Sequence, residues 1–389
     1  MLFDGLKPQA PDALLALIGM FAADPREGKI DLGVGVYRDE TGATPVFRAV
    51  KAAEAKLVET QSSKSYLGPE GDIRFTELLK PIVFGAGADT SSIVGVQTPG
   101  GTGALRLAAE LIASAKPKAT IWLGTPTWPN HPPTFSSAGL TLATYRYFDQ
   151  AAQHIRFDEM MDALNRAETG DVVLLHGCCH NPTGANLTSA QWAEVAAIVG
   201  KRGLLPLVDL AYQGLGGGLD EDSAGLRMVM EAAEDVIIAY SCDKNFGLYR
   251  DRVGALYVRA KQKARAELIL SNMLALARPN WSMPPDHGAA VVRTILEDAA
   301  LTADWRAELT SMRERITTVR EALAAGDSNF LAPIAQQQGM FSLLPISAEQ
   351  VATLRKDHAV YMAGSGRANL AGLTLKTVPK FIEALKAVR

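Results

Sequence analysis

The chain has 389 residues, of which 48% are hydrophobic and 21% charged, and its formal net charge is −3. This balance is ordinary for a globular protein, and the absence of a basic stripe argues against nucleic-acid binding. The opening run lacks a basic start and is broken by Pro8 and Pro11, and no stretch is long enough to cross a membrane. We therefore expect neither a signal peptide nor a membrane span.

The three cysteines do not form a disulfide framework, because Cys178 and Cys179 are adjacent and only Cys242 stands apart. The run from Cys178 to His180 also lacks zinc spacing. These features predict a cytoplasmic protein with no metal site.

The middle of the chain alternates short apolar runs with helical patterns. Strands are expected at 119–123, 172–175, 204–208, 236–239 and 253–258, and helices at 104–115, 157–166 and 189–201. Strands and helices in alternation predict βαβ units, and therefore an α/β fold whose mostly parallel sheet is buried on both faces.

The end of the chain has a different pattern. A helix at 302–323, strands at 339–343 and 359–362, and a closing helix at 377–388 predict a smaller α+β domain. We expect residues 1–45 to join this small domain, residues 46–300 to form the large domain, and residues 301–389 to form the small one.

Polar residues cluster directly after several predicted strands, at 127–128, 176–183, 209–213 and 241–252. Ligands of open α/β sheets bind outside the carboxyl ends of the strands. Lys244 lies in one of these clusters, in a loop between two predicted strands and close to Arg250 and Arg252. It is either a surface lysine in a basic turn, or a lysine whose lowered pKa makes it a nucleophile that forms Schiff bases.

Other residues of these clusters also allow two interpretations. The glycine-rich run from Gly100 to Gly103, which includes Thr102, precedes a predicted helix. It is either a phosphate-binding turn at the start of the helix or an ordinary loop before it. Asp209 ends an apolar strand and needs a cation, either a protonated pyridine nitrogen or an arginine. Tyr212 either points into the same space or is a core aromatic.

The remaining candidates are equally open when taken singly. Asn181 precedes Pro182 in a turn and either presents its amide to a ligand or serves the turn alone. Trp128, between prolines, either stacks on a planar ring or fills a gap in the core. Arg367 among small residues, and Arg278 before a proline-rich segment expected to be extended, are either carboxylate ligands or surface arginines.

Together these residues are the set that a pyridoxal phosphate enzyme acting on a carboxylated amino acid requires. The chain resembles the class I, fold-type I aminotransferases of the aspartate/aromatic amino-acid subgroup. The resemblance covers almost the whole length and rests on the runs at 31–37, 44–46, 66–71, 176–184 and 241–252 and on Arg367. It implies a large domain with a mostly parallel sheet of seven strands between helices.

The resemblance also implies the roles of the cofactor-binding residues. Lys244 forms a Schiff base with pyridoxal 5′-phosphate and carries a proton between the substrate Cα and the cofactor. Asp209, supported by His131, pairs with the pyridine nitrogen. The other ring contacts are Trp128, which stacks on the ring, and Tyr212 and Asn181, which bond its hydroxyl oxygen. Lys244, Asp209, Tyr212 and Trp128 form the catalytic set.

The phosphate and substrate groups follow from the same resemblance. The phosphate is held by Gly101, Thr102, Ser241 and Arg252, with Tyr66 of the neighbouring subunit. Arg367 binds the substrate α-carboxylate, and Arg278 of the neighbouring subunit binds a distal carboxylate. Gly35, Asn181 and Trp128 complete the substrate contacts. Sites shared in this way require a homodimer.

The implied reaction moves an amino group between aspartate or aromatic amino acids (tyrosine, phenylalanine) and 2-oxoglutarate by a ping-pong mechanism. Decarboxylation or β-elimination on the same cofactor, and a regulator without activity, are the alternatives. The residues do not rank aspartate against aromatic substrates.

The chain departs from the family pattern at three places. Asp243 stands where a small hydroxyl residue is expected, and we expect it to face outward. Leu215 replaces an aromatic residue before Gly216 to Gly218, which we expect to loosen the loop. Met283 replaces a residue that is often polar in aspartate-specific relatives, and its apolar side chain is compatible with tolerance of aromatic substrates.

Overall fold

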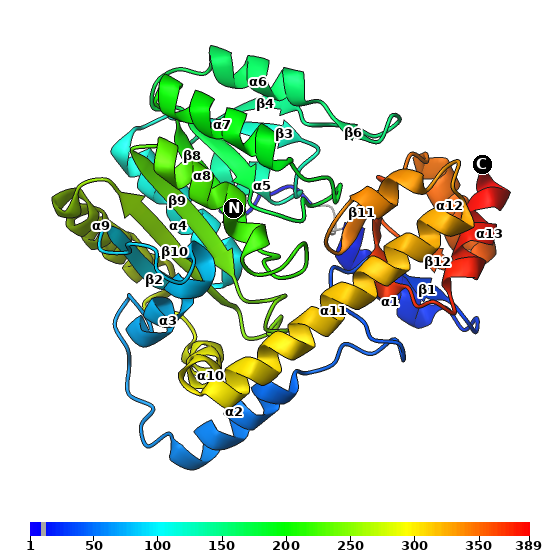
Figure 1. Ribbon diagram of the computed structural model, residues 1–389, viewed down its shortest axis with the longest axis horizontal. Coiled ribbons are helices and arrows are strands. Elements are labelled where there is room, and N and C mark those ends of the chain that lie inside the picture. Colours follow the sequence, from blue (N-terminus) through cyan, green and yellow to red (C-terminus); the bar gives the residue numbers. More distant parts are fainter. Residues whose placement is uncertain (9–12) are drawn as a thin grey trace.

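The computed structural model describes residues 1–8 and 13–389, and a seven-stranded sheet lies at its centre (Figure 1). The strand order is β2 (Ile93–Pro99), β10 (Val253–Ala260), β9 (Asp235–Ser241), β8 (Leu205–Leu210), β7 (Val172–His176), β3 (Thr120–Thr125) and β4 (Thr141–Arg146). Only β10 runs antiparallel to its neighbours among these seven strands. The expected mostly parallel sheet of seven strands is confirmed.

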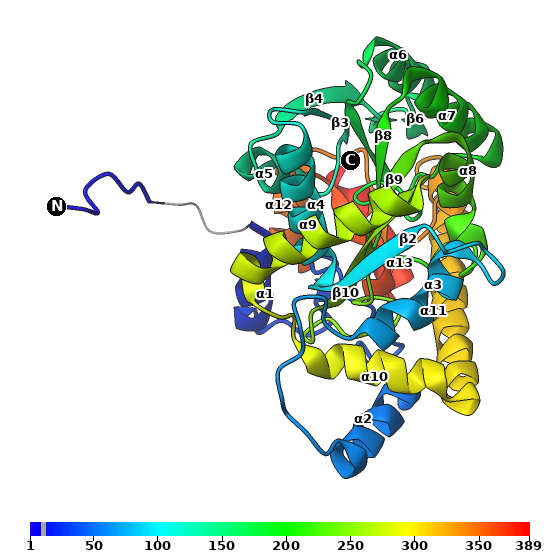
Figure 2. The same cartoon turned by 90° about the vertical axis from the view of Figure 1, so that its left-hand side faces the viewer.

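Helices cover both faces of the sheet, which explains why its inner strands are almost continuously apolar. One apolar cluster includes residues of α4 (Gly100–Ala115), α5 (His131–Ser137) and α9 (Lys263–Trp281). The other includes residues of α2 (Arg48–Thr60), α3 (Ile73–Phe84), α6 (Phe157–Arg166), α7 (Ser189–Arg202), α8 (Ala224–Ala232) and α10 (Asp286–Glu297). Figure 2 shows α4 and α9 on one side of the sheet.

A third apolar cluster joins the two ends of the chain. It contains Ile30 and Leu32 together with residues from Val319 to Leu385. Two small sheets lie here: β1 (Ile30–Asp31) pairs with β12 (Val360–Tyr361), and β11 (Phe341–Leu343) pairs with β13 (Arg367–Asn369). The helices of this part are α1 (Ala13–Ala23), α12 (Ala348–His358) and α13 (Val378–Val388).

The long helix α11 (Ala299–Gly326) links these parts, because it packs against α2 and α10 near one end and α13 near the other (Figure 1). Its start is capped by Asp298, whose side chain accepts hydrogen bonds from the N–H groups of Ala300 and Leu301. The helix begins at the expected boundary of residue 300 and runs beyond it, and the division into two domains stays a prediction.

Short elements complete the fold. They are β5 (Phe148–Asp149), β6 (His154–Ile155), and the 3₁₀ turns η1 (Glu221–Ser223), η2 (Ala332–Gln336) and η3 (Leu370–Gly372). No helix in residues 1–8 or 13–389 is both long and apolar enough to cross a membrane.

Two expectations about local structure were wrong. The segment after Arg278 is not extended throughout, because α9 continues through Pro279 to Trp281. The loop after Leu215 is not loose, because the Asp222 carboxylate accepts hydrogen bonds from the N–H groups of Gly214, Gly216 and Gly217 at 2.7–2.9 Å. Leu215 itself is buried.

Candidate active site

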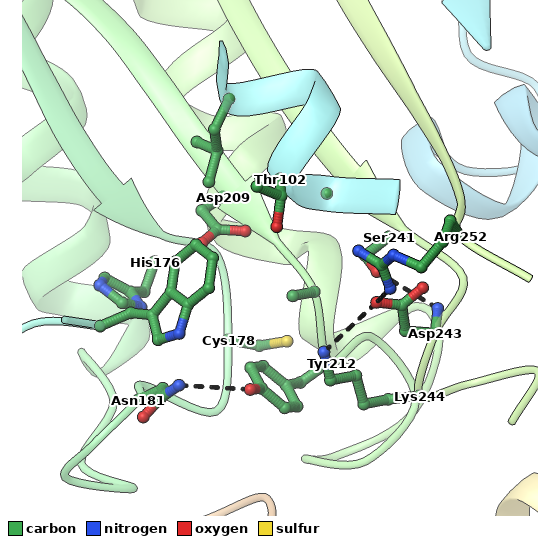
Figure 3. Close-up of a pocket in the computed structure, with 14 residues that line it drawn as sticks. Thr102, His176, Cys178, Asn181, Asp209, Tyr212, Ser241, Asp243, Lys244 and Arg252 are labelled. Atoms are coloured by element: carbon green, nitrogen blue, oxygen red, sulfur yellow. Dashed lines mark hydrogen bonds and ion pairs between the residues drawn. The ribbon is translucent and has the colours of Figure 1, made fainter. Parts of the chain in front are cut away.

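One cavity gathers most of the predicted cofactor residues at the carboxyl ends of β7, β8 and β9 (Figure 3). The amino end of α4 faces the same space, because β2, which precedes α4, also ends at this edge. The predicted residues that line the cavity are Gly101, Thr102, Trp128, Asn181, Asp209, Tyr212, Ser241, Lys244 and Arg252. The position agrees with the general rule for open α/β sheets.

Lys244 follows β9 and points into this cavity, with its side chain 18% exposed. Its Nζ lies 5.2 Å from the centre of the Tyr212 ring and 3.8 Å from Oδ2 of Asp243. Burial lowers the pKa of Lys244, and the charge of Arg252 lowers it further, although Asp243 and Asp209 oppose this shift. The net effect increases the neutral, nucleophilic fraction of the amine.

Asp209 is oriented by a chain of hydrogen bonds. Nε2 of His131 lies 3.0 Å from its Oδ2, and Oγ1 of Thr127 lies 2.7 Å from Nδ1 of His131 and 3.0 Å from Nε2 of His176. Burial alone raises the pKa of Asp209, but the hydrogen bond from His131 and the electrostatic interactions with His131, His176 and Lys244 together outweigh burial and leave the pKa below its ordinary value. Burial and His131 lower the pKa of His176 to about 3. The chain therefore presents an ionised Asp209 beside a neutral His176.

Tyr212 and Asn181 lie opposite the strand ends and connect to Arg367. Nδ2 of Asn181 donates to the Tyr212 hydroxyl at 3.3 Å, and Nη1 of Arg367 donates to Oδ1 of Asn181 at 3.4 Å. Burial raises the pKa of Tyr212, although Arg367 opposes the rise. The phenol therefore remains protonated and can donate a hydrogen bond.

The amino end of α4, Ser241 and Arg252 form a tight cradle. Gly100 has a φ of +68°, and a Cβ there would lie 2.5 Å from Nη2 of Arg252. A Cβ added to Gly101 would lie 3.1 Å from Cβ of Ser241. Free N–H groups at a helix start, a hydroxyl and a guanidinium are the donors that a phosphate requires. The residues present therefore fit the phosphate of pyridoxal 5′-phosphate.

Asp243 corrects the expectation that it faces outward. It is 6% exposed and lines the cavity, and its Oδ2 accepts a hydrogen bond from Nη1 of Arg252 at 2.6 Å (Figure 3). The pairing with Arg252 offsets part of the cost of burying the Asp243 carboxylate, and this pairing exists only in the folded loop.

A second cavity adjoins the first and shares Trp128, Asn181, Tyr212 and Lys244 with it. Its other wall comes from Gly33 to Gly35, Phe341 and Arg367. Arg367 is 5% exposed, donates from Nη2 to the Gly33 carbonyl at 2.8 Å, and lies 4.6 Å from the centre of the Phe341 ring. A Cβ at Gly35 would lie 2.8 Å from the same ring, so a larger residue there would require the Phe341 ring to shift.

The family model for aminotransferases of classes I and II matches residues 27–385. The chain belongs to this family. It is 56% identical to a tyrosine aminotransferase of Rhizobium meliloti over 96% of both chains, and 43% identical to an aspartate aminotransferase of Escherichia coli over the full length of both.

Solved structures agree with this assignment. An aromatic amino acid aminotransferase with 3-indolebutyric acid superimposes with a TM-score of 0.96 at 47% identity, each chain being covered in full. The enzyme of Burkholderia pseudomallei covalently bound to pyridoxal phosphate gives a TM-score of 0.96 at 37% identity, covering 100% of this chain and 99% of that one. The chain is a pyridoxal phosphate-dependent aminotransferase.

Two predicted residues of the aminotransferase lie outside both cavities of their own chain. Tyr66 is 92% exposed, and Arg278 is exposed near the end of α9, where its Nη1 donates to Oγ of Ser282. Both were expected to serve a neighbouring subunit, so their exposure is compatible with that expectation. Met283 also lies outside both cavities.

The residues that line the cavities of this aminotransferase include several to which sequence reasoning gave no site role, among them His176, Cys178 and Phe341. His176 is the last residue of β7 and Cys178 lies two residues beyond it, so their position in the chain was a usable signal. Phe341 belongs to a short strand of the third cluster, and nothing in its local pattern distinguishes it from a core residue.

Proposed function

We propose that this aminotransferase moves the amino group of an aromatic amino acid or aspartate to 2-oxoglutarate by a ping-pong mechanism. The observation that carries the proposal is the arrangement of Lys244, Asp209 and Arg367 around two joined cavities. One group suits a covalent bond to the cofactor, one suits its ring nitrogen, and one suits a substrate carboxylate.

The chemistry divides between the cofactor and the chain. When bound, pyridoxal 5′-phosphate supplies the electron sink that makes the substrate α-proton acidic. With the cofactor bound, the neutral Nζ of Lys244 would be the base that accepts and carries the substrate α-proton. The Asp209 carboxylate, oriented by His131, would stabilise a proton on the pyridine nitrogen of the bound cofactor.

Binding of the substrate α-carboxylate falls to Arg367. Its guanidinium is fixed by the Gly33 carbonyl and by Asn181, so it loses little freedom when it pairs with an anion. Asn181 and the protonated Tyr212 would hold the cofactor's ring oxygen through donated hydrogen bonds. Trp128 offers a flat face for stacking at the border of the two cavities.

The space beside Arg367 favours aromatic side chains. A groove of about 930 Å³ opens there, and its apolar wall includes Leu17, Met20, Val351 and Met362. A close relative is named a tyrosine aminotransferase, and a solved relative holds 3-indolebutyric acid. Aspartate is the second substrate class, because a relative at 43% identity is named an aspartate aminotransferase.

The proposed homodimer follows from Tyr66 and Arg278. Each is exposed in a single chain, and the cradle and the substrate cavity of a neighbour are where a phenol and a guanidinium would find partners. The location stays a prediction: the three buried, free cysteines are compatible with the cytoplasm.

A half-reaction panel tests the proposal. The loaded enzyme is mixed separately with tyrosine, phenylalanine and aspartate, without any oxo acid, and its visible absorbance is followed. We expect conversion to the aminated cofactor with all three amino acids, together with one equivalent of 2-oxo acid. Release of carbon dioxide or ammonia instead would contradict transamination.

A further inference from the structure

Asp243 places a negative charge inside the cradle that suits a phosphate. The cradle consists of the amino end of α4, Ser241 and Arg252, and Asp243 lies within it, 6% exposed. Its Oδ2 pairs with Nη1 of Arg252 at 2.6 Å. The backbone N–H of Asp243 donates to Oγ of Ser241 at 3.2 Å, which fixes the residue against the same cradle.

The second oxygen of this carboxylate is also buried. Oδ1 of Asp243 has no hydrogen-bond partner among the described residues. Nζ of Lys244 lies 3.8 Å from the other oxygen, Oδ2. A buried carboxylate with one oxygen unsatisfied is stabilised mainly by its arginine. The pair leaves Arg252 already neutralised when the cradle holds no phosphate.

We propose that Asp243 competes with the cofactor's phosphate for Arg252 and so weakens the binding of pyridoxal 5′-phosphate. The inference rests on the proposed function, because it takes the cradle to be the phosphate site. A phosphate bound there either displaces the Asp243 carboxylate from Arg252 or lies beside it. The first arrangement leaves a buried carboxylate without its arginine, and the second places two anions next to each other. A neutral residue at 243 removes this competition.

The same geometry allows a different effect, in which Asp243 acts through the charge of Lys244. The two effects separate by ligand. Competition at Arg252 concerns only ligands that carry a phosphate, whereas a change at Lys244 affects every aldehyde that bonds to its Nζ. Pyridoxal, which has the aldehyde and lacks the phosphate, distinguishes them.

The experiment titrates cofactor-free native protein, Asp243→Asn and Asp243→Ser with pyridoxal 5′-phosphate and with pyridoxal, and follows the visible absorbance of the bound aldehyde. We expect both variants to bind pyridoxal 5′-phosphate roughly tenfold more tightly than the native chain, from removal of one like charge at short range. Their affinity for pyridoxal changes much less than their affinity for pyridoxal 5′-phosphate, because only the latter ligand carries a phosphate. Inorganic phosphate raises the melting temperature of both variants more than that of the native protein.

Asp149→Asn is the matched control, because it breaks a partly buried pair with Arg156 far from the cradle. It leaves both affinities unchanged. Equal or weaker binding of pyridoxal 5′-phosphate by the Asp243 variants would overturn the inference, and so would an equal gain for pyridoxal. Absence of an absorbance band in every protein would instead refute the proposed function.

Discussion

The two ends of the active site are built in different ways. The cofactor end uses residues at the ends of neighbouring strands and at the start of α4, so one sheet fixes their positions. The substrate end brings together Gly35, Phe341 and Arg367, of which the first and last are more than 300 residues apart in the sequence. The cofactor residues are therefore positioned by a single sheet. The fit of the substrate depends instead on how the two ends of the chain pack together.

Substitution of Lys244 by alanine tests the cofactor end most severely. We expect transamination to fall by about 10⁴-fold or more, because the proton carrier is lost. The cradle remains, so the variant still binds pyridoxal 5′-phosphate non-covalently. Steady-state assays and equilibrium dialysis measure the two effects, with the exposed Lys201→Ala as control. Turnover near the native rate would contradict the assignment of Lys244.

Asp209→Asn tests the same end through the pyridine nitrogen. We expect a loss of about 10³-fold in kcat, because a neutral amide no longer stabilises a proton on the ring nitrogen. The affinity for substrate changes little, since Arg367 is untouched. Rapid-mixing kinetics of the half-reaction provide the measurement. A variant that loses substrate affinity and keeps kcat would show that Asp209 belongs to the substrate end.

Arg367→Ala probes the substrate end. We expect kcat/KM to fall by about 100-fold for tyrosine and aspartate alike, because each loses a charged hydrogen bond to its α-carboxylate. Arg278→Ala, by contrast, lowers kcat/KM for aspartate and spares phenylalanine. Neither change affects the affinity for pyridoxal 5′-phosphate. Equal losses of aspartate and phenylalanine turnover in the Arg278 variant would refute this division between the arginines.

The smallest effect concerns stability and pH in the cofactor-free protein. The folded-state pKa of Lys244 lies below its ordinary value of 10.5, so between these two values the unfolded chain holds more protons. Lowering the pH through this window therefore reduces the free energy of unfolding of the native protein. At pH values below the folded-state pKa, Lys244 is protonated in both states and its contribution no longer changes with pH. Lys244→Met should gain melting temperature relative to the native chain as the pH falls from 10.5. A gain that grows with rising pH would contradict the sign of the shift.

The sequence predicted the cofactor end better than the substrate end for a physical reason. Asp209 and Lys244 each follow an apolar strand, and parallel strands bring their carboxyl ends together without further information. The strands β2 and β4 were missed: β2 carries the buried Gln97, whose side-chain hydrogen bonds go to Asp72 and Pro285, and β4 is a half-exposed edge strand. Their patterns resemble loops until the tertiary partners are known.

Asp243 shows where local reasoning fails. Its neighbours in sequence gave no reason to place a carboxylate inside a cavity. Its partner Arg252 lies nine residues away across a tight loop, and only the folded loop brings them to 2.6 Å. Phe341 is a similar case, because its contact with Arg367 depends on the pairing of β11 with β13.

Reductive trapping tests the central claim most directly. The enzyme loaded with pyridoxal 5′-phosphate is treated with borohydride, digested, and its peptides are analysed by mass spectrometry. Our account predicts a single modified lysine, Lys244, in the peptide that follows β9, and no modification after prior conversion of the cofactor by an amino acid. Modification of a different lysine, or no modification of the loaded enzyme, would contradict it.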